Sequence, residues 1–198
     1  MNPRIAFIAA PLLVMAYGVI RILDGLDGSR GPGLAWTSGH LAFMAALILF
    51  VSTFLQMRRM AGGNVLSTVT TGLGVFGILT LFVQFGIDLV VGFMSADHAA
   101  MSVLFDQVQA VPGVPILIYQ GGPLLFFAAQ TAIVAQLAVQ RRVKAWTPVL
   151  VLLDCVLPFA NKDLMPLGAL FLLISFVPLA GQVSRTAKPG SAPAPSLV

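Results

Sequence analysis

Charged residues are scarce in this chain of 198 residues, of which only 9% are Asp, Glu, Lys or Arg. An average soluble domain carries about 25% charged residues. Hydrophobic residues make up 58% of the chain, and the mean hydropathy is +0.96. This balance excludes a soluble single-core domain, a disordered chain and a nucleic-acid-binding module. The composition therefore predicts a polytopic membrane protein.

Residues that ligate metals or form disulfides are also few. The chain has one cysteine, Cys155, and two histidines, too few for a disulfide scaffold, a zinc centre or a haem site. It contains no glutamate, so all seven acidic residues are aspartates. Walker, GxSxG and HExxH motifs and Asp-rich magnesium clusters are missing from the sequence. We expect no metal and no cofactor, and we expect any chemistry to occur inside the membrane.

Apolar runs predict about six membrane-spanning helices, because about 20 apolar residues cross the hydrocarbon core. Their approximate ranges are 5–22, 34–57, 66–94, 114–139, 146–160 and 164–182. We interpret the first run as a retained span rather than a cleaved signal peptide. The sequence thus predicts an all-α, integral membrane helix bundle over residues 1–182 and a disordered cytoplasmic tail, rich in proline, over residues 183–198.

The distribution of basic residues predicts the orientation of this bundle in the cell membrane. With the N-terminus in the cytoplasm, three of the 11 Lys and Arg residues lie outside, namely Arg21, Arg30 and Lys162, and the other eight lie inside or in the tail. Cytoplasmic loops carry an excess of basic residues in membrane proteins. We therefore expect both termini on the cytoplasmic side.

Two aspartates lie well inside predicted spans, where an ionisable group costs about 2.5–3.5 kcal/mol. Asp88 follows Gln84 by four residues, which places both on one helix face. Asp154 is flanked by apolar residues, so burial would keep its carboxyl protonated and able to donate a proton. Both could instead serve packing, Asp88 by an interhelical hydrogen bond or a pair with Arg21, and Asp154 by bonding a carbonyl freed by Pro158.

A polar mouth above an apolar cavity is predicted near the outer ends of the helices. His40 lies one turn after Trp36 in the second span, Tyr17 lies near the outer end of the first, and Tyr119 opens the fourth. His40 is a third catalytic candidate, although an interfacial histidine also serves packing or headgroup contacts. Aromatic faces could stabilise a cation in the cavity. The predicted substrate-binding residues are Gln84, Tyr119, Trp36, Tyr17, Phe85 and Phe127.

Three segments resemble small actinobacterial integral membrane proteins of about six helices: SGHLAFMAALILF, FGIDLVVGF and the Arg-Arg connector before the fifth span. More distantly, the chain is similar to small membrane-bound terpene cyclases of indole-terpenoid and meroterpenoid pathways. Those enzymes lack a metal–diphosphate motif and use membrane-embedded carboxyls to protonate an alkene or epoxide. The resemblance implies that Asp88 and Asp154 are the acids and that Phe and Trp faces guide the cation. The better-known fungal members have seven spans and pair Glu with Asp, unlike this chain.

Three functions follow from these observations. The first is an acid-initiated cyclase or isomerase of a lipophilic isoprenoid, as in terpenoid secondary metabolism. The second is a small transporter or exporter, which buried acids would allow to be proton-coupled. The third is a non-catalytic accessory or immunity subunit, in which the polar residues serve packing. The expected partners are a lipophilic small molecule and the lipid bilayer, without nucleic acid, and the sequence does not set the oligomeric state.

Overall fold

The computed structural model describes residues 3–26, 28 and 30–186, and it confirms the all-α class because no strand occurs among them. The elements in chain order are α1 (Pro3–Asp24), α2 (Leu34–Met60), α3 (Val65–Met94), α4 (His98–Gln109), η1 (Pro115–Gly121), α5 (Gly122–Val139), α6 (Thr147–Ala160), η2 (Lys162–Leu164) and α7 (Met165–Thr186). Of these, η1 is a π-helix and η2 is a 3₁₀-helix.

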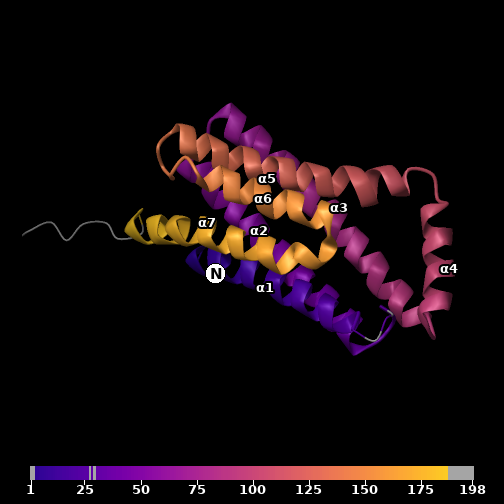
Figure 1. Ribbon diagram of the computed structural model, residues 1–198. Helices are drawn as coiled ribbons and strands as arrows, with labels where there is room; N and C mark the ends of the chain where they lie inside the picture. The colour runs from indigo at the N-terminus through magenta and orange to yellow at the C-terminus, as the bar shows by residue number, and fades with distance from the viewer. Residues whose placement is uncertain (1–2, 27, 29, 187–198) are drawn as a thin grey trace, which may run out of the picture.

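The long helices run roughly side by side, and α1 begins at the end of the bundle where α7 finishes (Figure 1). Helix α1 packs against α2 and α7, α3 packs against α2 and α5, and α6 contacts both α5 and α7. Helix α4 lies across the opposite end of the bundle, connecting α3 to η1 (Figure 1). The sequence did not predict α4, which lies in the expected outer loop between two spans.

Five helical segments are long and apolar enough to cross a membrane: Arg4–Asp24, Leu34–Met60, Val65–Met94, Pro115–Val139 and Lys162–Val183. The fifth predicted span, 146–160, forms α6, which has only 14 residues. At about 1.5 Å per residue, an α-helix of that length falls short of the roughly 30 Å hydrocarbon core. The described residues therefore include five helices of spanning length and one shorter apolar helix packed beside them.

Part of the predicted tail belongs to helix α7. Helix α7 continues to Thr186, so residues 183–186 are helical. Residues 187–198, the rest of that predicted tail, lie outside the described residues. The N-in, C-in orientation stays a prediction.

Packed phenylalanines fill the half of the bundle nearest the start of α1. The rings of Phe7 and Phe176 meet edge to face with their centroids 5.4 Å apart, and those of Phe50 and Phe126 do so at 5.2 Å. None of these four residues is more than 2% exposed. Aromatic side chains thus pack most of this half of the bundle, and the functional candidates other than Asp154 gather in the other half.

Glycines bring α3 and α5 into backbone contact. A Cβ atom at Gly77 would lie 2.5 Å from the backbone nitrogen of Phe126 and 2.8 Å from the carbonyl oxygen of Gly122. A Cβ atom at Gly122 would in turn overlap the Thr80 hydroxyl. Backbone atoms cannot rotate away from such an atom as a flexible side chain can. Only glycine therefore permits this crossing, which fixes α5 against the middle of α3.

We expect Gly77→Ala to lower the free energy of unfolding by about 1–3 kcal/mol, because an added methyl group overpacks a helix contact. Gly72→Ala is the matched control, since a Cβ atom at Gly72 meets nothing within 4 Å. Thermal unfolding in detergent, followed by circular dichroism, measures both variants. Equal transition temperatures for the two would contradict the close crossing.

Candidate functional site

A cavity of about 380 Å³ opens in the half of the bundle away from the phenylalanine core. Its volume falls within the range of roughly 300–1,000 Å³ that is usual for small-molecule sites. Of the sequence-predicted site residues, all but Asp154 line this cavity. Those lining it are His40, Asp88, Gln84, Tyr119, Trp36, Tyr17, Phe85 and Phe127.

The orientation of His40 is set by its own helix. Its Nδ1 atom lies 2.7 Å from the backbone carbonyl oxygen of Trp36, one turn earlier in α2. A carbonyl oxygen can only accept a hydrogen bond, so Nδ1 carries the proton that is donated. The other ring nitrogen, Nε2, then faces Asp88 Oδ2 on α3 at 3.6 Å. His40 is 4% exposed, so this pair is shielded by the helices around it.

Asp88 is held from three sides. The Tyr119 hydroxyl donates to Oδ1 at 3.2 Å, while Oδ2 faces His40. The Trp36 indole N–H donates to the backbone carbonyl of Asp88 at 3.0 Å, which ties α2 to α3 beside the carboxyl group. Arg21, the ion-pair partner considered for Asp88, pairs with Asp163 instead. The cavity wall therefore contains one polar cluster, formed by Asp88 from α3, His40 from α2 and Tyr119 from η1. This cluster is an interhelical contact.

Tyr119 reaches Asp88 from a π-helical turn. The backbone N–H of Gly122 donates to the carbonyl of Leu117, five residues earlier, as in a π-helix. Pro123 has no N–H to donate, and its ring would clash with the carbonyl of Tyr119 in a regular α-helix. The chain therefore widens before α5 begins. π-helical turns are rare and occur frequently at functional sites.

Aromatic rings surround His40. The centroid of its ring lies 4.2 Å from that of Trp36, 5.1 Å from that of Phe85 and 5.7 Å from that of Tyr17. Phe43 continues this wall by stacking on Phe85 at 4.3 Å with an interplanar angle of 10°. Such faces attract cations through their quadrupoles. The enclosure therefore suits a cation held close to these rings.

Gln84 contributes an acceptor that the protein does not use. Its amide oxygen is buried, and no group in the described part of the chain donates a hydrogen bond to it. Its side chain lines the same cavity as Asp88, one helical turn away on α3. A buried acceptor without a donor is destabilising by about 1–3 kcal/mol. The position suits a ligand that carries a hydrogen-bond donor.

Asp154 lies apart from this cluster. It is 5% exposed, and the amide nitrogen of Gln130 on α5 lies 3.5 Å from its Oδ2 atom. It lines a second pocket of about 40 Å³, room for about one or two water molecules. The two pockets have Phe43 and Phe127 in common, with Pro158 and Met165. The structure therefore joins Asp88 to His40 but places Asp154 in a different pocket.

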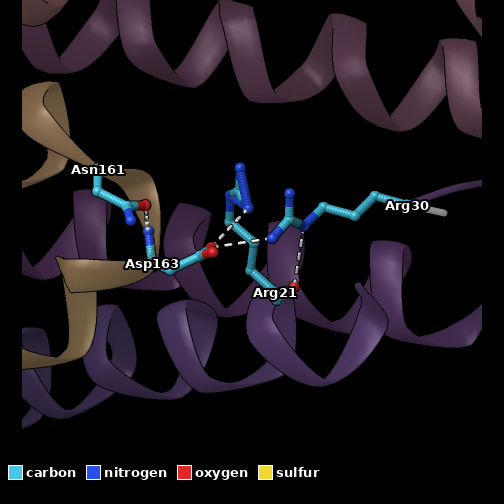
Figure 2. A network of polar contacts seen from close by, with 4 residues as sticks. All are labelled: Arg21, Arg30, Asn161 and Asp163. Atoms are coloured by element: carbon cyan, nitrogen blue, oxygen red, sulfur yellow. Dashed lines mark hydrogen bonds and ion pairs between the residues drawn. The ribbon is translucent and has the colours of Figure 1, made fainter. Parts of the chain in front are cut away.

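Several residues at the site were missed by the sequence analysis. Arg30 and Lys162 line the mouth of the cavity, and Phe43 lines its wall. Figure 2 shows Arg21 and Arg30 reaching Asp163 from two separate segments. A signal for this mouth was present, because the three basic residues predicted to lie outside are the ones gathered there.

No family model, curated protein or solved structure matches the chain. The similarity to actinobacterial membrane proteins and terpene cyclases therefore stays a prediction.

The two tryptophans provide a test of ligand binding, because Trp36 lines the cavity and Trp146 is 42% exposed at the start of α6. In a Trp146→Phe variant, we expect a lipophilic ligand that fills the cavity to shift the Trp36 emission and to protect it from acrylamide. In a Trp36→Phe variant, the same ligand should leave the Trp146 emission unchanged. A response from Trp146 alone would place binding outside the cavity.

Proposed function

We propose that this chain is an integral membrane cyclase or isomerase that protonates an alkene of a lipophilic isoprenoid. The single observation that carries the proposal is the pairing of Asp88 with His40 at 3.6 Å inside an aromatic enclosure. The proposed setting is the cell membrane, with both termini cytoplasmic. Helix α6 would be a short additional span, which brings the number of spans to six. The product would be a terpenoid.

The proposed reaction needs only a proton donor and a proton acceptor. The proton on Asp88 Oδ2 moves to one alkene carbon, and the π electrons form the new C–H bond, leaving a carbocation on the other carbon. In a cyclase, a second double bond of the same chain then attacks this cation and forms a C–C bond. His40 Nε2 removes a proton from a neighbouring carbon, and that C–H electron pair becomes the new double bond.

The pairing of the two side chains closes the cycle. The proton taken up by His40 passes back to Asp88 Oδ2, which Nε2 faces. Substrate and product are therefore isomers, and no cofactor is consumed. Tyr119 holds the other oxygen, Oδ1, and so keeps Oδ2 directed at His40. The roles proposed here are proton donor for Asp88, proton acceptor for His40 and positioning for Tyr119.

The walls of the cavity suit a cationic intermediate. The faces of Trp36, Phe85 and Tyr17 lie around the pair at the distances given above. Aromatic faces stabilise a desolvated cation by about 2 kcal/mol or more, without offering a nucleophile that would trap it. An apolar substrate in this cavity would also displace water, which would otherwise add to the cation.

We expect Asp88→Asn to reduce product formation by about 10²–10⁴-fold, the usual contribution of a general acid, while the protein still folds. Asp106→Asn is the matched control, because Asp106 is exposed on α4 and does not line the cavity. Protein in nanodiscs is incubated with farnesol, geranylgeraniol and their phosphates, and products of unchanged mass are separated by chromatography. In D₂O the isomer should gain up to one deuterium. Equal turnover in the Asp88→Asn and Asp106→Asn variants would contradict the proposal.

We expect Asp154→Asn to lower turnover by less than about tenfold, because Asp154 does not line the cavity that holds Asp88 and His40. An amide has nearly the shape of a carboxyl group and can still bond to Gln130. The same product assay, with thermal unfolding alongside, measures this variant. If Asp154→Asn abolished turnover and Asp88→Asn did not, the small pocket would be the reaction site instead.

A further inference from the structure

Three basic residues from separate segments meet at the mouth of the large cavity. Arg21 lies in the last turn of α1, Arg30 lies in the connection to α2, and Lys162 is the first residue of η2. The other basic residues whose side chains are described lie toward the opposite end of the bundle, at Arg4, Arg58, Arg59, Arg141, Arg142 and Lys144. Basic residues are less frequent in the loops on the outer side of a membrane than in the cytoplasmic loops. The presence of three of them at one cavity mouth therefore indicates a function for these residues.

Asp163 holds the two arginines in place. A single oxygen of Asp163, Oδ1, lies 2.9 Å from Nη2 of Arg30 and 3.4 Å from Nη1 of Arg21 (Figure 2). Arg30 Nε also donates to the backbone carbonyl of Arg21 at 3.2 Å. The backbone N–H of Asp163 is bound in turn by Asn161 Oδ1 at 2.9 Å. The guanidinium groups are thus positioned before any ligand arrives.

This network leaves hydrogen-bonding capacity at the mouth. It uses one side-chain N–H group of Arg21 and two of Arg30, so most of their donors stay available. The side chain of Lys162 makes no hydrogen bond or ion pair with the described residues, and Lys162 is exposed. Among the described residues, the cavity lining at the mouth contains these three bases and one carboxylate, that of Asp24. Asp163, which pairs with the two arginines, is not part of the lining.

We propose that this mouth binds a phosphoester anion at the end of an apolar chain, so that the substrate is an isoprenyl phosphate or diphosphate. The isoprenoid nature of the chain rests on the function proposed above. Guanidinium groups bind phosphate oxygens in a two-pronged geometry, and an ammonium group adds a point charge. The apolar chain would lie below, among Tyr17, Phe85 and Phe127, where it reaches Asp88.

Anchoring the anion at the mouth determines which bond reacts. The phosphoester stays bound to the bases while Asp88, deeper in the cavity, protonates a double bond of the chain. The C–O bond to phosphate is not broken, so the carbocation forms by protonation and not by loss of diphosphate. The product would retain its phosphoester group and remain an isomer of the substrate.

A binding experiment tests this inference without using turnover. Trp146→Phe protein in phosphatidylcholine nanodiscs is titrated with farnesyl diphosphate and with farnesol, and the Trp36 emission is recorded. We expect the diphosphate to bind at least about tenfold more tightly than the alcohol. Adding Lys162→Gln, or Arg30→Gln, should weaken the diphosphate about tenfold and leave farnesol unchanged. Lys144→Gln, at the opposite end of the bundle, is the control and should change neither affinity.

A second arm distinguishes a soluble ligand from a bilayer phospholipid as the source of the phosphoester. If phosphatidylglycerol in the nanodisc competes with farnesyl diphosphate and Lys162→Gln removes the competition, the site stands and lipid headgroups also occupy it. Equal affinities for alcohol and diphosphate, or a preference that survives both Arg30→Gln and Lys162→Gln, would overturn the site. Lys162→Gln removes no side-chain hydrogen bond or ion pair from the described part of the chain and replaces an exposed residue, so we expect this variant to fold as the parent does.

The inference and the proposed function can fail separately. Asp88→Asn protein should bind farnesyl diphosphate as tightly as the parent does, even though it forms no product. If binding follows this pattern but no isomer ever forms, the phosphoester site stands and the proposed reaction is wrong. If isomers form while alcohol and diphosphate bind equally, the reaction stands and the phosphoester site is wrong.

Discussion

The backbone contact between α3 and α5 is the constraint on which the site depends. Gly77 has no side chain, so the backbone of α5 can approach α3 closely. Gly122 leaves room for the Thr80 side chain at the same crossing. The chain before this crossing must then reach back toward the end of α3 that carries Asp88, and it does so through a π-helical turn. That turn delivers Tyr119 to Asp88. Two glycines deep in the bundle thus position a hydroxyl group in the half that contains the cavity.

Polar pairing explains which buried groups serve structure and which are left for a ligand. Every polar atom of the Trp36–His40–Asp88 contact has a partner from another position in the bundle, so these side chains cannot move independently. Gln84 differs, because its buried oxygen accepts nothing from the described residues. The cavity therefore combines the Asp88–His40 pair, which is held in place by its partners, with a Gln84 oxygen that accepts no hydrogen bond from the described residues. Such a combination is expected where binding and proton transfer occur in the same cavity.

The sequence identified most of the cavity because charge is so rare in it. An aspartate or histidine within an apolar run stands out, and the helical spacing of Gln84 and Asp88 gave their common face. Helix α4 was missed because its apolar pattern is too short for a span, although Asp97 is a typical N-cap that accepts from the N–H of Ala100. The separation of Asp154 depends on which neighbour α6 faces, and spacing within one helix carries no such information.

The π-helical turn makes the site sensitive to chain length as well as to residue identity. Successive side chains around an α-helix differ by about 100°, so each residue added or removed rotates everything that precedes a fixed crossing. With α5 held at Gly122, removing Gln120 or Gly121 would turn Tyr119 by about 100° around the helix axis, away from Asp88. A relative of this chain could retain Asp88, His40 and Tyr119 and still lose the contact between them through a single deletion.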